Sequence, residues 1–192
     1  MTGVQTCALP ISIRALSRAL AARGERVAIV TNDQGHALVD TALVQGDAAM
    51  VSEIGGGCFC CRYPELEAAL FAAEDAGASV AVAEAVGSCT DLVATVLSPL
   101  AERHGGRFRL APLSIVVDPW RVREIANGAF SDDVAYLFRK QLEEADVIVV
   151  SRADASPPDV SEALREIRRE AAIVRISATT GAGIGKIGRA HV

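Results

Sequence analysis

Six short aliphatic segments, separated by segments with helical periodicity, constrain most strongly what this chain can fold into. The aliphatic segments are rich in Val, Ile and Ala and occupy residues 26–31, 49–54, 79–84, 113–118, 146–150 and 172–177. Runs of this kind are typical of parallel strands that are buried on both faces of a sheet. Hydrophobic residues make up 51% of the chain and aromatic residues 4%, so we expect an aliphatic core.

The segments between these strands predict helices. They occupy residues 12–23, 65–76, 91–103, 120–126, 132–143 and 157–169. Ser12 is the expected N-cap of the first helix, and Pro64 falls at the first turn of the second. Strands that alternate with helices imply right-handed crossovers between parallel strands. We therefore predict an α/β fold, with an open, mainly parallel sheet and helices on both faces.

Composition excludes several classes of function. The net charge is −5, from 19 basic and 24 acidic side chains, and no basic block stands out, so we expect no nucleic-acid partner. No apolar run reaches the roughly 18 residues of a membrane span, so we expect no membrane partner. The five cysteines are an odd number and three lie close together, which is unlike a secreted disulfide scaffold and predicts a cytoplasmic location.

The two ends of the chain look unlike the rest. Residues 1–11 and 185–192 resemble translated adapter sequence, so we interpret both as non-native scars that flank a single domain at 12–184. Cys7 lies in the first of these scars and receives no functional role.

Three cysteines follow three glycines in the second strand-to-helix connection. Cys58, Cys60 and Cys61 stand within four residues of one another, directly after the glycines at 55–57. Clustered thiolates select zinc, copper(I) or a similar soft ion, and zinc favours four ligands. Three thiols leave one position open, and the candidates for a fourth ligand are His36, Asp33, Asp40 and Glu53. The alternatives are a redox cluster, a buried turn of small residues and, for His36, an exposed loop histidine.

Polar residues collect where the predicted strands end. These residues are Asn32, Asp33, Glu84, Asp118, Ser151, Asp154 and Ser177. Ligands of open α/β sheets bind outside the carboxyl ends of the strands, so we expect this edge to carry the site. Asp118 is interpreted as the cap of the helix after Pro119. Cys89 is interpreted as a small apolar residue packed at a helix start.

The order of these motifs resembles that of the CobW-type P-loop GTPases, which share a superfamily with nickel-insertion GTPases. Residues 31–35, with Asp40, resemble the family's switch I segment, and residues 57–61 match its Gly-Cys-x-Cys-Cys metal motif. Glu84 and Gly87 match its Glu-x-x-Gly switch II segment. Residues 141–150 resemble the strand before the guanine-specificity motif, and Ser177 with Ala178 resembles the last guanine-contacting loop.

The resemblance implies a GTP-dependent metallochaperone that holds zinc or a similar soft ion and couples GTP hydrolysis to its transfer. The implied nucleotide-site residues, besides Glu84 and Gly87 in the catalytic segment, are Asn32, Asp33, Asp40, Ser151, Asp154, Ser177 and Ala178. Carboxylates among them would contact Mg²⁺, and Gly87 would donate its amide to the γ-phosphate. The implied partners are a client metalloprotein or cofactor-assembly enzyme, and a second copy of the chain in a homodimer.

Two departures from the family set limits on this expectation. The sequence contains no Gly-x-x-x-x-Gly-Lys-Ser/Thr, the loop whose amides and lysine hold the phosphates. We therefore expect a truncated copy, without its first strand and phosphate loop, that is deficient as a GTPase. Ser151 also stands where the family has an asparagine, which weakens the preference for guanine. Two alternative functions are a nucleotide-independent zinc-binding module and a thiol-redox protein.

Overall fold

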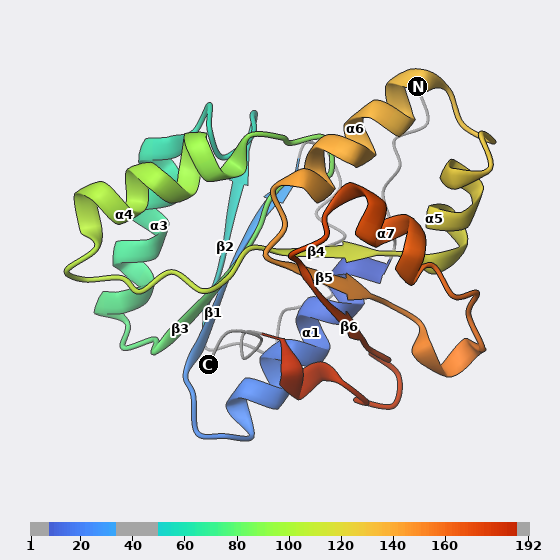
Figure 1. Cartoon of the computed structure of the whole chain (residues 1–192). Coiled ribbons are helices and arrows are strands. Elements are labelled where there is room, and N and C mark those ends of the chain that lie inside the picture. Colours follow the sequence, from blue (N-terminus) through green and yellow to red (C-terminus); the bar gives the residue numbers. More distant parts are fainter. Residues whose placement is uncertain (1–7, 34–49, 188–192) are drawn as a thin grey trace. The chain divides into compact units, whose positions relative to one another are not determined.

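The computed structural model describes residues 8–33 and 50–187 (Figure 1). The predicted ligands His36 and Asp40 lie outside the described residues, and Asp33 is described by its backbone. The chain divides into two compact units, residues 1–89 and 90–192. Each unit is built around its own three-stranded parallel sheet.

The described part of the first unit contains three strands and two helices. In chain order they are α1 (Ala8–Ala21), β1 (Val27–Asp33), β2 (Met50–Gly55), α3 (Tyr63–Asp75) and β3 (Val80–Glu84). Strand β1 lies between β2 and β3, and both of its pairings are parallel. Thr31 of β1 pairs with Glu53 on one side and with Glu84 on the other. The carboxyl ends of the three strands therefore meet at one edge of this sheet.

The core of the first unit lies on β1. Residues 27–30 of this strand are at most 2% exposed, and Ile13 of α1 packs with Val27 and Ile29. Helix α1 begins at Ala8, four residues before the predicted start. The prediction that Ser12 caps this helix was wrong, because Ser12 is a buried residue within it. Pro10 fits in the first turn because its missing N–H has no helical partner there.

The second unit carries the other three strands. Its elements are η1 (Val93–Leu97), α4 (Ser98–His104), β4 (Ser114–Val117), α5 (Pro119–Ala126), α6 (Asp132–Glu143), β5 (Val147–Val150), η2 (Ala153–Ala155), α7 (Ser161–Ile167), β6 (Ala172–Arg175) and η3 (Ile184–Lys186). Strand β5 is fully buried between β4 and β6, and both pairings are parallel. The predicted α/β class and parallel strands are confirmed, although the strands form two sheets.

Two predicted helices differ from those observed. The segment at 91–103 begins as a π-helical turn, η1, and continues as α4. The segment at 157–169 becomes helical only at Ser161. Pro157 and Pro158 precede a turn in which the Asp159 carboxylate accepts a hydrogen bond from the Ser161 amide at 3.0 Å. This side-chain bond satisfies a free amide at the helix start, so the helix begins there.

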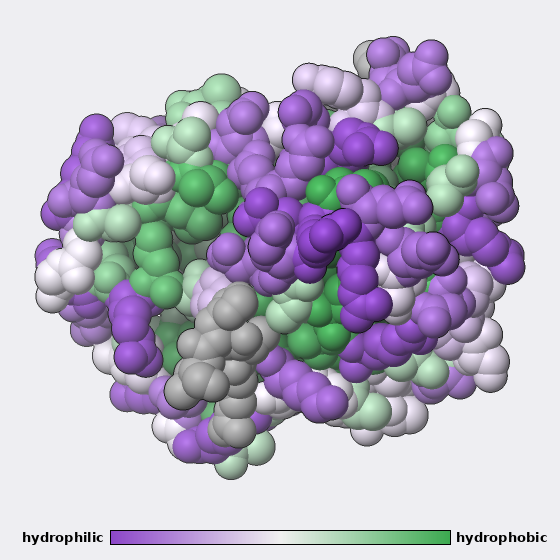
Figure 2. Space-filling view, in the orientation of Figure 1, coloured by the Kyte–Doolittle hydropathy of each residue, from purple (hydrophilic) through white to green (hydrophobic). Residues whose placement is uncertain are grey.

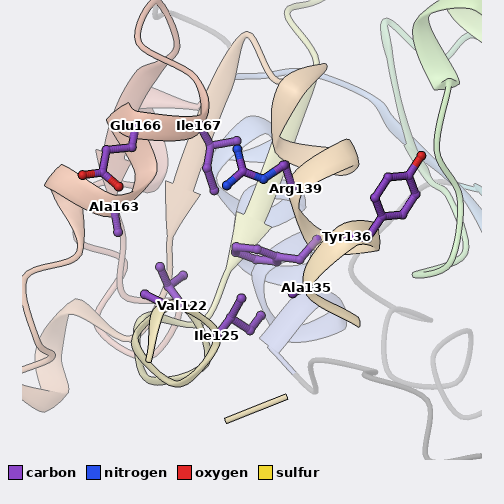
Figure 3. A pocket seen from close by; sticks show the side chains of 10 residues that line it. Val122, Ile125, Ala135, Tyr136, Arg139, Ala163, Glu166 and Ile167 are labelled. Atoms are coloured by element: carbon purple, nitrogen blue, oxygen red, sulfur yellow. The ribbon is translucent and has the colours of Figure 1, made fainter. Parts of the chain in front are cut away.

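The second unit packs its helices onto a core that includes Leu142, Ile148 and Leu164, each 0% exposed. On the face seen in Figure 2, hydrophilic residues cover most of α6 and α7, with apolar residues between them. A cavity of about 460 Å³ lies among α5, α6 and α7, and the side chains around it are mainly apolar (Figure 3). None of the predicted site residues lines this cavity. Among the described helices, none is long and apolar enough to cross a bilayer.

Candidate metal centre

The cysteine loop begins where β2 ends, at the carboxyl edge of the first sheet. Gly56 has φ +76°, a backbone conformation that favours glycine. Phe59 is 3% exposed and anchors the loop in the core, whereas Cys60 and Cys61 beside it are exposed. The local sequence therefore buries one aromatic side chain and leaves two thiols at the surface.

Asn32, near the end of β1, holds this loop in place. Its Nδ2 atom donates to the carbonyl oxygen of Ile54 at 2.8 Å and to that of Gly57 at 2.7 Å. Its Oδ1 atom is buried and meets no donor among the described residues. Buried acceptors are rarely left unpaired.

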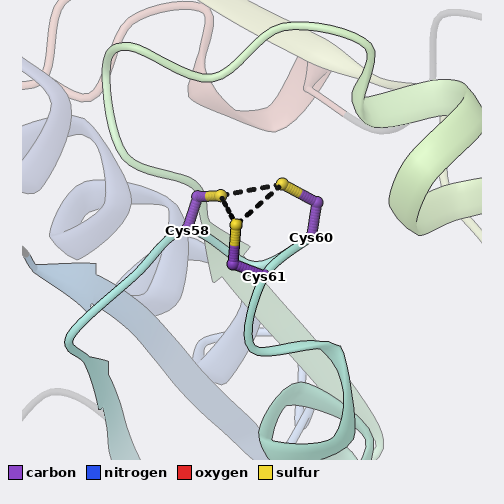
Figure 4. Close-up of side chains that lie close together, drawn as sticks. All are labelled: Cys58, Cys60 and Cys61. Atoms are coloured by element: carbon purple, nitrogen blue, oxygen red, sulfur yellow. Dashed lines mark hydrogen bonds between the residues drawn. The ribbon is translucent and has the colours of Figure 1, made fainter.

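The three predicted thiols point toward one another (Figure 4). The Sγ atom of Cys58 lies 2.7 Å from that of Cys60 and 3.2 Å from that of Cys61, and the last two are 4.0 Å apart. Zinc with sulfur at ~2.3 Å in a tetrahedral site sets its sulfur atoms roughly 3.8 Å apart. A small opening of the Cys58 contacts would make room for such an ion, so the group fits a soft metal.

The thiols also change one another's acidity. Hydrogen bonds with Cys60, and then with Cys61, lower the pKa of Cys58 to about 7. The same contact with Cys58 raises the pKa of Cys60 to about 11. Near neutral pH, the cluster thus holds a thiolate at Cys58 that neighbouring thiols stabilise. A preformed thiolate suits both a metal ligand and a nucleophile.

A fourth thiol that the sequence reasoning set aside lies next to this group. Cys89 follows β3 in the loop that also contains Gly87, and its amide donates to the carbonyl oxygen of Val86 at 2.9 Å. Its side chain is 9% exposed and hydrogen-bonds with Cys58. Burial, followed by the charge of Cys58, raises the pKa of Cys89 to about 12. The sequence did contain a clue to this position, because Cys89 stands two residues after Gly87, which was expected at the same edge of the sheet.

The acidic residues predicted for this edge lie at the ends of the strands. Asp33 ends β1 and pairs with Gly55, and Glu84 ends β3 and is half-buried. The structure therefore brings the backbone of Asp33, the side chain of Glu84 and the cysteine loop to the same edge of one sheet. Glu53 is half-buried in β2 and is not a member of the compact group formed by Cys58, Cys60 and Cys61.

In the second unit, two of the residues predicted to contact guanine lie together. The Ser177 hydroxyl hydrogen-bonds with the Asp154 carboxylate and lowers the pKa of that carboxyl below its usual range. Ser177 Oγ also accepts from the Thr180 amide at 3.1 Å. Ser151 is buried, and its hydroxyl donates to the carbonyl oxygen of Val117 at 2.9 Å. Ala178 directly follows Ser177 in the loop after β6.

Asp118 has the structural role that the sequence suggested. Its carboxylate accepts from the amides of Trp120 and Arg121, at 2.9 and 3.3 Å, and so caps α5. The same carboxylate forms an ion pair of 2.6 Å with Arg152. The Arg152 guanidinium lies over the Trp120 ring, 4.5 Å from its centroid. These contacts order the segment between β5 and η2.

The parallel sheets and the thiol group at a carboxyl edge define an α/β domain with a loop-borne candidate metal site. The sequence matches the family "CobW/HypB/UreG, nucleotide-binding domain" over residues 13–177. This chain belongs to that family. It resembles the crystal structure of the hydrogenase maturation factor HypB from Archaeoglobus fulgidus with a TM-score of 0.56 and 17% sequence identity, over 92% of this chain and 79% of that one. A search of curated proteins found no match.

Proposed function

We propose that this chain carries a soft divalent ion, with zinc as the first candidate, as cargo on Cys58, Cys60 and Cys61, and that nucleotide binding in this family's domain controls its release. The observation that carries the proposal is the convergence of the three Sγ atoms, which all lie within 4.8 Å of one another. Exposed sulfur at Cys60 and Cys61 suits an ion that must be handed to a client protein.

The link to nucleotide is proposed through the strands that meet at the same edge. Asn32 joins the end of β1 to the cysteine loop by two hydrogen bonds, and Glu84 ends the neighbouring strand. A ligand that displaced the end of β1 would therefore strain the metal loop. The carboxylates of Asp33 and Glu84 are oxygen ligands of the kind that Mg²⁺ prefers, directly or through water. When bound, Mg²⁺ neutralises charge on the phosphates.

Recognition of guanine is proposed for Asp154 and the loop at Ser177 and Ala178. The Asp154 carboxylate, whose pKa the hydrogen bond from Ser177 lowers further, is ionised near neutral pH and can accept from the ring N–H and amino group of a guanine. The Ser151 hydroxyl already donates its hydrogen bond to the carbonyl oxygen of Val117. This supports a weaker contribution from Ser151 than the family's asparagine would make.

The experiment is a zinc titration of the reduced chain in competition with a chromophoric chelator, with and without GTP and Mg²⁺. A second protein would carry a strand and a Gly-x-x-x-x-Gly-Lys-Ser/Thr loop added before α1. The proposal predicts one zinc ion per chain in both proteins and a nucleotide-dependent fall in affinity in the second. Equal affinities with and without bound GTP would instead support a nucleotide-independent zinc module.

A thiol-redox protein is the second candidate, and the lowered pKa of Cys58 with Cys61 Sγ at 3.2 Å favours it. A thiolate with a second thiol in reach is the arrangement that disulfide exchange requires. The two functions differ in how zinc affects alkylation. Zinc protects Cys58, Cys60 and Cys61 from iodoacetamide if they bind the metal, and it leaves the reaction rate unchanged if they serve only in exchange.

A further inference from the structure

We infer that Cys89 is the fourth thiolate of the metal site, so that a bound ion has four sulfur ligands, three from the cysteine loop and one from the loop after β3. The inference rests on the proposed metal-binding function and extends it to a residue on a different strand connection. It replaces the oxygen and nitrogen candidates for the fourth position with a sulfur.

The sheet register explains why two distant segments reach one site. Strands β2 and β3 flank β1 on either side, and both are parallel to it. Their following loops therefore leave the sheet at the same edge. Asn32 holds the first loop by its Ile54 and Gly57 carbonyl groups, and the turn from Val86 to Cys89 folds the second. Neither loop needs to be rebuilt for the two to meet.

The side-chain contacts place Cys89 beside the existing group. Its thiol hydrogen-bonds with Cys58 and interacts electrostatically with Cys60 and Cys61. The sulfur atoms of Cys58, Cys60 and Cys61 form the compact group. Cys89 lies next to this group and contacts it at Cys58. A tetrahedral ion bound by the three thiolates presents its fourth position to one more ligand, and a neighbouring sulfur fits a soft ion better than an oxygen does.

Cys89 differs from the exposed loop thiols because it is buried. Cys89 is 9% exposed, whereas Cys60 and Cys61 are exposed. Closed four-ligand sites hold zinc firmly, and sites with an open position exchange a ligand. Cys89 lies five residues after Glu84 and two after Gly87. Movement of this segment would therefore withdraw one sulfur, leaving a three-thiolate site from which a client can take the ion.

The test counts the sulfur atoms around zinc by X-ray absorption spectroscopy at the zinc edge. The reduced chain carries Cys7→Ser, so that the remaining thiols are those of Cys58, Cys60, Cys61 and Cys89. Native mass spectrometry establishes that one zinc ion is bound to a monomer. Four sulfur atoms at ~2.3 Å then require Cys89. Three sulfur atoms and one lighter atom would overturn the inference while leaving the proposed function in place.

The variant Cys89→Ser, in the same background, supplies the matched comparison. The expected result is the loss of one of the four sulfur atoms and the gain of one lighter ligand, with zinc still bound. A sulfur count that does not change would contradict the inference. If Cys89→Ser fails to fold, the count in the Cys7→Ser chain decides the question by itself. A Cys7→Ser chain that folds but binds no zinc would overturn the proposed function together with this inference.

Discussion

Replacing Asn32 by aspartate removes the donor that holds the cysteine loop and keeps the shape of the side chain. The Nδ2 atom donates to Ile54 and Gly57 at 2.8 and 2.7 Å, and an aspartate oxygen at that position would face two carbonyl oxygens instead. Two hydrogen bonds contribute about 2 kcal/mol, and a buried carbonyl left unpaired costs ~1–3 kcal/mol more. We therefore expect Asn32→Asp to lower the free energy of unfolding of the first unit by about 3–5 kcal/mol.

The same change should weaken zinc binding, because a loosened loop must be ordered again when the metal binds. If about 1.4 kcal/mol of the lost free energy appears in binding, the zinc affinity falls tenfold. The assay is chelator competition on the reduced protein, with Asn32→Ala to separate the lost donor from the added charge. Ser79→Ala is the control, because Ser79 accepts from the Arg26 amide at the opposite end of the same sheet. Zinc affinities for Asn32→Asp and Asn32→Ala within twofold of the unmodified chain would show that the Asn32 hydrogen bonds do not support metal binding.

Three further predictions concern other groups. Because hydrogen bonds lower the Cys58 pKa to about 7, its thiolate is populated above that pH, and its iodoacetamide labelling rate should rise through pH 7; mass spectrometry would show this, and a midpoint at pH 9 would contradict it. Leu142 is 0% exposed, so Leu142→Ala should destabilise the second unit by about 2–5 kcal/mol in urea unfolding. Asp118→Ala removes the cap of α5 and the Arg152 ion pair, and should cost about 1–2 kcal/mol, measured by Trp120 fluorescence; unchanged stability would show that the cap contributes nothing.

Much of the fold could be predicted from the sequence because its periodicity is strong. Aliphatic runs such as residues 146–150 have few alternatives to a buried parallel strand, and β5 is that strand. The start of α1 was misplaced because Ser12 has the chemistry of a cap, while the helix continues back to Ala8 and buries it. The start of α7 was misplaced because Pro157 and Pro158 also suit a turn before a helix.

The candidate site was partly visible in the sequence. The spacing of Cys58, Cys60 and Cys61 predicted their convergence, because so short a loop keeps its side chains close together. Cys89 was missed because its contact with Cys58 depends on which strands are neighbours. Spacing along the chain does not give the order of strands in a sheet. The two hydrogen bonds from Asn32 to the cysteine loop were missed for the same reason, because Ile54 and Gly57 lie 22 and 25 positions further along the chain.

The proposed function requires that the loop thiols hold one soft metal ion. Native mass spectrometry of the reduced chain, after incubation with zinc and removal of loosely bound ions, tests it most directly. We expect one zinc ion per chain, and none in a variant that combines Cys58→Ser, Cys60→Ser and Cys61→Ser but keeps Cys7 and Cys89. A folded reduced chain without zinc, or a triple variant that retains zinc, would show that these thiols are not the metal site.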